Sequence, residues 1–215
     1  MARSRFRKLD AEKREALLAA AGEEFAEKGF EGASLNRVIE AAGFSKGSLY
    51  YYFEDKEDLY RTVAEEAMGR VLEAVGGYPD PVELTAADYW ERLREFFLRA
   101  GMVLQRRDWW VKLLWAFRRL SVERGAGAAA FEPALLQARE WTAAYLARGQ
   151  ELGAVRKDLP LELLVRVAMA VDEASDRWLL EHRDVYTAGQ MEEYVEAAVD
   201  LLHDMLDARN EGWER

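Results

Sequence analysis

Apolar residues recur at three- and four-residue spacing along nearly the whole chain, as in helices that each bury one face. The four prolines stand only at positions 79, 81, 133 and 160, so long segments contain no helix breaker. No run of alternating apolar and polar residues is flanked by hairpin turns, so strands are not expected. The sequence therefore predicts an all-α fold.

The composition limits the class of protein. The chain has 215 residues, of which 50% are hydrophobic and 12% aromatic, which predicts one or two globular domains with a sizeable core. The absence of cysteine excludes a disulfide framework, thiolate-bound zinc and a thiol nucleophile. No apolar segment follows the basic start, and no apolar run approaches the ~18 residues of a membrane span. We therefore expect a cytoplasmic protein without a signal peptide or a membrane partner.

The net charge of −10 argues against binding to nucleic acid, because the field of an acidic protein repels phosphates. The distribution of charge changes this expectation. Arg3, Arg5, Arg7 and Lys8 stand in the first eight residues without an acid, whereas residues 61–215 carry most of the excess acidity. An acidic chain with a basic N-terminal tip is compatible with local contact to DNA.

Capping residues and glycines predict four helices in the first third of the chain. Their expected ranges are Asp10–Lys28 before Gly29, Ser34 to Gly43, Ser45–Phe53, and Asp55 to Gly76 and Gly77. Longer helices are expected over Thr85–Arg106, Asp108–Glu123, Phe131–Leu152, Leu161–His182 and Thr187–Ala208. We expect a flexible basic arm at 1–10, a three-helix head at 11–71 and a helical-bundle body at 72–215.

Two short helices joined by a turn that contains Gly43 predict a helix-turn-helix. At about 100° per residue, Leu49 and Phe53 share the inward face of the second short helix, and Tyr51 lies about 180° away. Three consecutive tyrosines cannot all be buried on one helix, so at least Tyr51 is expected to be exposed.

An exposed tyrosine beside Lys46, Gly47 and Ser48 suits a DNA groove. The glycine permits close approach, hydroxyl groups bind phosphates or base edges, and the ring can contact a thymine methyl group. A surface tyrosine at an oligomer contact explains the same spacing equally well, so both interpretations stay open at this point.

The segment from Ala42 to Leu59, AGFSKGSLYYYFEDKEDL, resembles the signature of the TetR family of transcriptional regulators. The resemblance extends from about Ala11 to Val71 and includes the stretch Phe25–Phe30. A weaker similarity covers Gly149–Leu159. The resemblance implies a DNA-binding head and a body that binds a ligand and dimerises.

Carried over by position, the resemblance implies a DNA-binding set. Tyr50 and Lys56 would contact phosphates, and Tyr52 would do so although it stands where a histidine is common. The full expected set is Ser34, Asn36, Ser45, Lys46, Gly47, Ser48, Tyr50, Tyr51, Tyr52 and Lys56. The arginines of the basic arm either enter the minor groove or are plain solvated charge. Glu54, Asp55, Glu57 and Asp58 are explained by helix capping and the helix dipole.

The resemblance also implies a homodimer through the last two helices, although internal core helices would show the same apolar stripes. It further implies a small-molecule pocket in the body, where six of the seven tryptophans lie between residues 90 and 178. An aromatic cage with acids suits a cationic, apolar ligand, whereas an ordinary Trp-rich core with paired acids is the alternative. The expected ligand-binding residues are Trp109, Trp110, Trp141, Tyr145, Met169, Asp172 and Asp176.

No catalytic constellation is apparent. His203 lies at metal-like spacing from Asp200 and Asp207, but with His182 the only other histidine a surface role is favoured over a metal site. Lone serines without a positioned base offer no catalytic triad. We therefore expect no enzyme, metal or cofactor, but a homodimeric repressor that a small-molecule ligand releases from its operator DNA. The rival classes are an all-helical protein-interaction or ligand-binding protein without DNA binding, and a helical enzyme.

Overall fold

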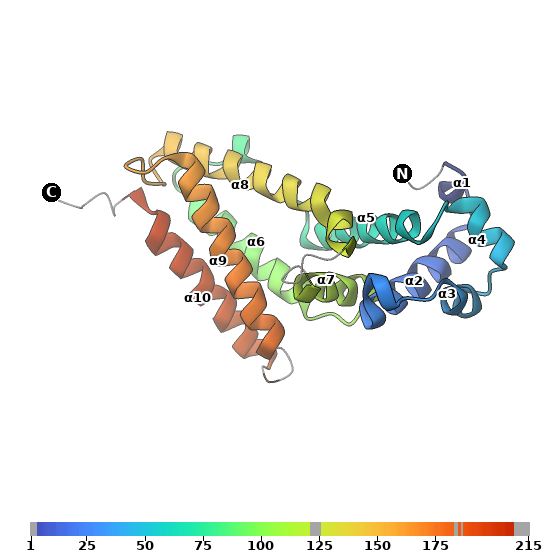
Figure 1. Cartoon of the computed structure of the whole chain (residues 1–215). Helices are drawn as coiled ribbons and strands as arrows, with labels where there is room; N and C mark the ends of the chain where they lie inside the picture. Colours follow the sequence, from blue (N-terminus) through green and yellow to red (C-terminus); the bar gives the residue numbers. More distant parts are fainter. Residues whose placement is uncertain (1–3, 121–125, 183–184, 186, 209–215) are drawn as a thin grey trace. The chain divides into compact units, whose positions relative to one another are not determined.

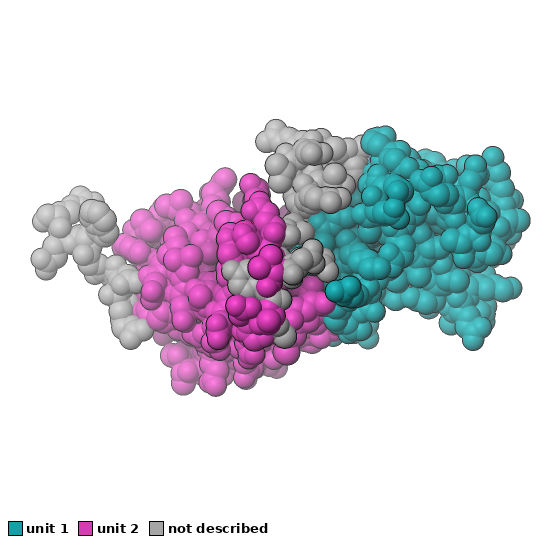
Figure 2. Space-filling view, turned by 90° about the horizontal axis from the view of Figure 1, so that it is seen from below, with its two compact units in different colours: residues 1–73, 106–134 teal, residues 74–105, 135–215 magenta. Residues whose placement is uncertain are grey.

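The computed structural model describes residues 4–120, 126–182, 185 and 187–208 (Figure 1). These residues form helices and no strand, apart from one isolated bridge between Val155 and Asp207, so the all-α prediction is confirmed. Contacts divide the chain into two compact units, shown in Figure 2: unit 1 comprises residues 1–73 and 106–134, and unit 2 comprises 74–105 and 135–215. None of the helices in these described ranges is both long and apolar enough to cross a membrane.

Unit 1 combines the short helices of the N-terminal part with two long ones. Its elements are α1 (Ser4–Arg7), α2 (Ala11–Gly32), α3 (Leu35–Ala42), α4 (Lys46–Tyr52), α5 (Lys56–Val75, to residue 73), α7 (Trp109–Leu120) and η3 (Ala126–Phe131). Asp10 caps α2 as predicted, because its carboxylate accepts from Glu12 N at 3.1 Å and Lys13 N at 3.2 Å. The predicted stop at Gly29 is also found: its φ of 67° interrupts the helical backbone.

The tryptophan-rich helix α7 belongs to unit 1, whereas the sequence placed it with the body. It packs on α2, where Gly22 makes room for the indole of Trp109; a Cβ at Gly22 would lie 2.2 Å from that ring. Trp109 and Trp110 are both buried, because α7 is covered on more than one side. Compact packing thus divides the chain differently from the head and body expected around residue 72, and that functional division stays a prediction.

Unit 2 consists mainly of four long helices. Its elements are η1 (Pro81–Glu83), α6 (Tyr89–Leu104), α8 (Glu132–Leu152, from residue 135), α9 (Leu161–His182) and α10 (Ala188–Leu206). Thr187 and Gln190 form a capping box at the start of α10. The helix expected from Thr85 starts only at Tyr89, because Asp88 accepts from the backbone N and the hydroxyl of Thr85, each at 2.8 Å, and closes a turn there.

Two buried tyrosines join α6 to α8 in unit 2. The Tyr89 hydroxyl donates to Tyr145 O at 3.1 Å, and the Tyr145 hydroxyl donates to Tyr89 O at 2.7 Å. Burial raises the pKa of both phenols, so both stay neutral donors. Gly149 lies under the Tyr89 ring, where a Cβ would come within 2.5 Å of that side chain. The core of unit 2 is therefore closely packed around this pair.

Candidate nucleic-acid interface

The turn between α3 and α4 has the geometry of a helix-turn-helix. Gly43 ends α3 in the left-handed conformation (φ 68°, ψ 27°), and Phe44 N donates to Ile39 O at 2.9 Å. Ser45 caps α4 as predicted, since its hydroxyl accepts from Ser48 N at 3.1 Å. The sequence thus codes both the stop and the restart.

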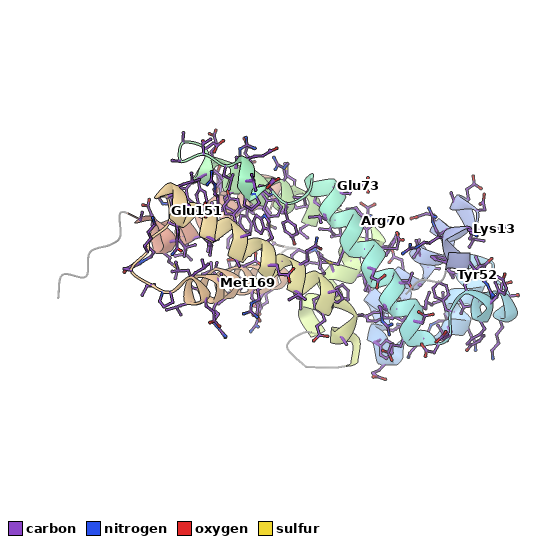
Figure 3. All side chains as sticks on the ribbon, turned by 90° about the horizontal axis from the view of Figure 1, so that it is seen from above. Lys13, Tyr52, Arg70, Glu73, Glu151 and Met169 are labelled. Carbon is purple, nitrogen blue, oxygen red and sulfur yellow. The ribbon has the colours of Figure 1, made fainter. Side chains whose placement is uncertain are left out.

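Packing fixes which side of α4 faces outward. Leu49 and Phe53 are each 1% exposed, whereas Tyr50 is 44% and Tyr51 is 53% exposed. The prediction that Leu49 and Phe53 point inward and Tyr51 outward is confirmed. Tyr52, labelled in Figure 3, is half-buried and meets the ring of Tyr51 edge-on at 5.1 Å.

The other predicted contact residues of the two helices also reach the surface. Asn36 on α3 is exposed, as are Ser45, Lys46 and Gly47 at the start of α4. Ser34 and Ser48 are half-buried. The structure therefore brings the α4 residues to one outward edge, with Asn36 and Ser34 at the start of the preceding helix; contact of these residues with DNA stays a prediction.

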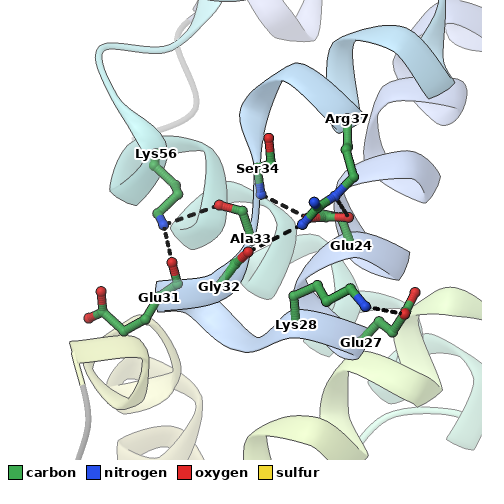
Figure 4. Close-up of polar contacts among 9 residues, drawn as sticks. All are labelled: Glu24, Glu27, Lys28, Glu31, Gly32, Ala33, Ser34, Arg37 and Lys56. Carbon is green, nitrogen blue, oxygen red and sulfur yellow. Dashed lines mark hydrogen bonds and ion pairs between the residues drawn. The ribbon is translucent and has the colours of Figure 1, made fainter.

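Ser34 does not cap α3 as expected, because its side chain makes no capping bond. Instead, Ser34 N donates to Glu24 Oε1 at 2.8 Å, and the Arg37 guanidinium donates from Nε to both oxygens of Glu24, at 2.9 and 3.0 Å (Figure 4). Arg37 also donates to Gly32 O at 3.3 Å. A carboxylate from α2 therefore fixes the start of α3.

Lys56 is engaged within the protein, whereas the resemblance implies a phosphate contact. Its Nζ donates to Glu31 O at 3.0 Å and to Ala33 O at 3.3 Å (Figure 4) and lies 4.8 Å from the centroid of Phe30. The ammonium thus satisfies carbonyls at the end of α2. Two acceptors leave one of its three N–H groups for a further partner.

Two of the four acids around Lys56, Asp55 and Asp58, accept backbone N–H groups near the start of α5, as the capping prediction expects. Asp58 N donates to Asp55 Oδ1 at 2.8 Å, and Glu54 N donates to Asp58 Oδ2 at 3.1 Å. These bonds satisfy backbone donors at the start of α5. The negative charge beside Lys56 therefore has a structural cause.

The basic N-terminal segment is partly folded, whereas the sequence predicts a flexible arm. Ser4–Arg7 form the helical turn α1, and Phe6 is buried with its ring 4.9 Å from that of Phe53. Arg3 lies outside the described residues, and the minor-groove role of the arm stays a prediction. The sequence signal for this docking was a single phenylalanine within a basic tip, which sequence reasoning missed.

The expected ligand-binding residues are divided between the units. Trp109 and Trp110 belong to unit 1, where Trp109 Nε1 donates to Glu15 at 3.2 Å. The Arg70 guanidinium also binds Glu15 and, with that indole, lowers the pKa of its carboxyl. Trp109 thus has a structural role, because it joins α7 to α2.

The remaining expected ligand-binding residues lie in unit 2. Trp141 stacks on Tyr78 with ring centroids 4.8 Å apart and donates to Pro79 O at 2.9 Å. Tyr145 is buried in the core, and Met169 (Figure 3) packs at its edge. Asp176 on α9 is buried, and Asp172, one turn earlier, is half-buried.

The carboxylates near His203 have separate partners. His203 Nε2 lies 3.0 Å from Asp207 Oδ2, whereas Asp200 forms an ion pair with Arg94. No group of three metal-ligating side chains was found among the residues that the structure describes.

Known proteins match the part of the chain that contains the helix-turn-helix. The family model for bacterial regulatory proteins of the tetR family matches residues 17–63, which contain α3 and α4. The repressor AcnR of Corynebacterium glutamicum is 42% identical over 62 residues, 29% of this chain and 33% of that protein. Residues 17–63 of this chain are therefore similar to the TetR family of bacterial regulatory proteins.

Two regulators match this chain over a longer range. AcnR of Corynebacterium jeikeium is 26% identical over 193 residues, 88% of this chain and 93% of that repressor. SmeT, the repressor of a Stenotrophomonas maltophilia multidrug efflux pump, shares the fold, with a TM-score of 0.67 at 18% identity and 91% coverage of each chain. The C. glutamicum match spans only a third of that relative. These relatives are regulators rather than enzymes.

We expect Glu24→Gln to destabilise unit 1 by about 0.5–1 kcal/mol at pH 7, because one charge-assisted contact is lost while the half-exposed Arg37 stays solvated. Arg37 lowers the pKa of the Glu24 carboxyl below its usual 4.5. The stabilisation is therefore present above about pH 4.5 and disappears as the pH falls through the lower, folded-state pKa. Denaturant unfolding at pH 7 and pH 3.5 measures both values. Glu27→Gln, which alters an exposed pair with Lys28, is the control and should have no effect; equal losses in the two variants would contradict the assignment.

Proposed function

We propose that this chain is a TetR-family DNA-binding transcriptional repressor that docks the outward edge of α4 in the major groove. The observation that carries the proposal is the exposed edge of Tyr50, Tyr51, Lys46 and Gly47 on a helix anchored by buried Leu49. Hydroxyls, an ammonium and an aromatic ring on one short helix suit phosphates and base edges. Since the DNA of a bacterium lies in the cytoplasm, we place the protein there.

Gly47 supports the proposal independently. It has an ordinary helical backbone, and a Cβ there would meet only Ser45 Oγ, at 4.0 Å. The fold of the chain therefore has room for a side chain at this position, although glycine in a helix costs about 0.5–1 kcal/mol relative to alanine. A bare backbone on an exposed helix suits a partner that approaches closely.

The remaining proposed contacts flank this edge. Asn36 and Ser34 stand at the start of α3, where side chains can meet phosphate or a base edge. Lys56 donates to two carbonyls, so its first proposed role is to stabilise the end of α2. Its second proposed role is to contact a phosphate through its third N–H. Tyr52 is half-buried, and only its hydroxyl is proposed as a phosphate donor.

Lys46→Ala should weaken binding to duplex DNA, because one phosphate contact is lost. The slope of log affinity against log salt should fall by about 1. The measurement is fluorescence anisotropy on genomic fragments that the wild-type protein retains, over a range of salt concentrations. Arg139→Ala removes an exposed charge from α8, outside the proposed DNA and dimer surfaces, and is the matched control. Equal effects of the two variants, or no salt-dependent binding by the wild type, would contradict the proposed site.

We also propose that the repressor is a homodimer through α9 and α10, which lie side by side (Figure 1). Leu201 and Met205, one turn apart on α10, remain exposed in the single chain, as does Leu163 on α9. Two linked heads gain affinity through effective concentration. Heads about 34–36 Å apart would meet successive major grooves of a near-palindromic operator.

Leu201→Arg should convert the dimer to a monomer and weaken operator binding at least tenfold, because a charge would enter an apolar contact. Light scattering and operator titration report the two effects. Leu136→Arg on α8 alters an equally exposed leucine and should change neither. A wild-type protein that is monomeric at micromolar concentration would contradict the dimer.

We further propose that a small molecule in unit 2 releases the DNA. Trp141 is the centre of an aromatic cluster, with ring centroids 4.8 Å from Tyr78, 5.2 Å from Phe96 and 5.1 Å from Tyr145. Such a cluster suits an apolar or cationic ligand. Release requires that the ligand bind the DNA-free form more tightly than the DNA-bound form.

The test compares lipophilic cations with uncharged compounds of equal size as competitors of the protein–operator complex. An effector should lower operator affinity about 5- to 150-fold. Trp141→Ala should lose this response while still binding the operator. A compound that binds unit 2 but leaves operator affinity unchanged is not the effector, and a full response of the Trp141→Ala variant would contradict the assigned site.

A further inference from the structure

We propose that Arg5 is a positioning residue of the DNA-docking edge, which holds the ring of Tyr51 from the folded turn α1. The proposal rests on the DNA binding proposed above. It replaces the flexible minor-groove arm with a built part of the head, and it assigns the N-terminal arginine to the same edge as α4.

The turn α1 is fixed to the core by an apolar anchor. Phe6 is 1% exposed, and its ring lies 4.9 Å from Phe53 and 6.1 Å from Tyr52, the two residues at the end of α4. Backbone bonds from Lys8 N to Arg5 O and from Leu9 N to Phe6 O, each 3.1 Å, close the turn. Burial of an aromatic side chain of this size is among the largest single contributions to a small core.

This anchor places Arg5 over the exposed tyrosine. The Arg5 Cζ atom lies 4.8 Å from the centroid of the Tyr51 ring, within the range of a cation–π interaction. The Tyr52 ring meets the same ring edge-on at 5.1 Å and an interplanar angle of 81°. Tyr51 is thus restrained by two partners while 53% of its surface stays accessible.

A restrained ring has less conformational freedom to lose when DNA binds. Ordering an exposed side chain at an interface costs about 0.5–1.5 kcal/mol, and a preorganised side chain avoids part of that cost. Preorganisation of the Tyr51 ring by Arg5 therefore favours docking on DNA.

The position of Arg5 separates this role from that of an arm. An arm arginine must extend away from the fold, whereas Arg5 directly precedes the buried Phe6 and lies within a hydrogen-bonded turn. If Arg5 acts through the Tyr51 ring, its contribution to binding disappears once that ring is removed. An independent minor-groove contact would keep its contribution.

A double-mutant cycle on operator affinity tests this coupling, with anisotropy on a genomic fragment that the full-length wild type retains. Arg5→Ala should weaken binding about three- to tenfold, and Arg5→Lys, which keeps a cation over the ring, should restore most of the loss. The Arg5→Ala/Tyr51→Ala variant should bind as Tyr51→Ala alone does. Arg7→Ala removes an exposed arginine of the same turn and should change affinity less than twofold.

Several outcomes would overturn the inference. Multiplicative losses in the double variant indicate an independent contact, and equal losses from Arg5→Ala and Arg7→Ala indicate diffuse charge. A melting temperature of Arg5→Ala well below that of the wild type indicates a purely structural role; we expect no change. A wild type that retains no DNA refutes the proposed function itself, whereas wild-type binding that Arg5→Ala leaves unchanged refutes only the role of Arg5.

Discussion

Burial of Leu49 and Phe53 orients α4, and the exposed edge depends on that orientation. A seven-residue helix is too short to be stable alone, so contacts with its neighbours must hold it. The three tyrosines follow one another between these two anchors, and helical geometry forces at least one of them outward. Phe6 packs on Phe53 from the N-terminal turn. The same apolar contacts that hold α4 therefore leave Tyr50 and Tyr51 accessible at the surface.

Polar contacts stabilise the helix ends of unit 1, which apolar packing does not satisfy. The ends of short helices leave backbone groups without partners, and water or side chains must satisfy them. Glu24 accepts hydrogen bonds from Ser34 N and from the Arg37 guanidinium. Lys56 donates to two carbonyls at the end of α2. Exposed ion pairs contribute little by themselves. These two side chains matter because each joins segments that are far apart in sequence at a helix end.

Predictions from the sequence were right for features that neighbouring residues determine. They failed for features that depend on contacts between segments far apart in the chain. Helical periodicity, the caps at Asp10 and Ser45, and the inward side of α4 follow from residues within a turn or two of each other. The docking of Phe6 depends on residues almost fifty positions away, and the pairing of Trp109 with Gly22 on nearly ninety. The apolar sequence of a helix such as α7 predicts that the helix is buried. Its periodicity does not identify the element on which it packs.

The same distinction resolves the conflict between an acidic chain and a DNA-binding edge. Net charge is a sum over the molecule, whereas phosphates sense charges within about 8–10 Å at physiological salt. Three acids of unit 1 are bound internally: Glu15 to Arg70, Glu24 to Arg37, and Asp55 to a backbone N–H at the start of α5. Arg37 and Arg70 hold the pKa values of Glu24 and Glu15 low, which keeps both carboxylates charged and paired. Pairing reduces the field of these carboxylates at close range, so the total of −10 overstates the negative charge that opposes Lys46 at the edge of α4.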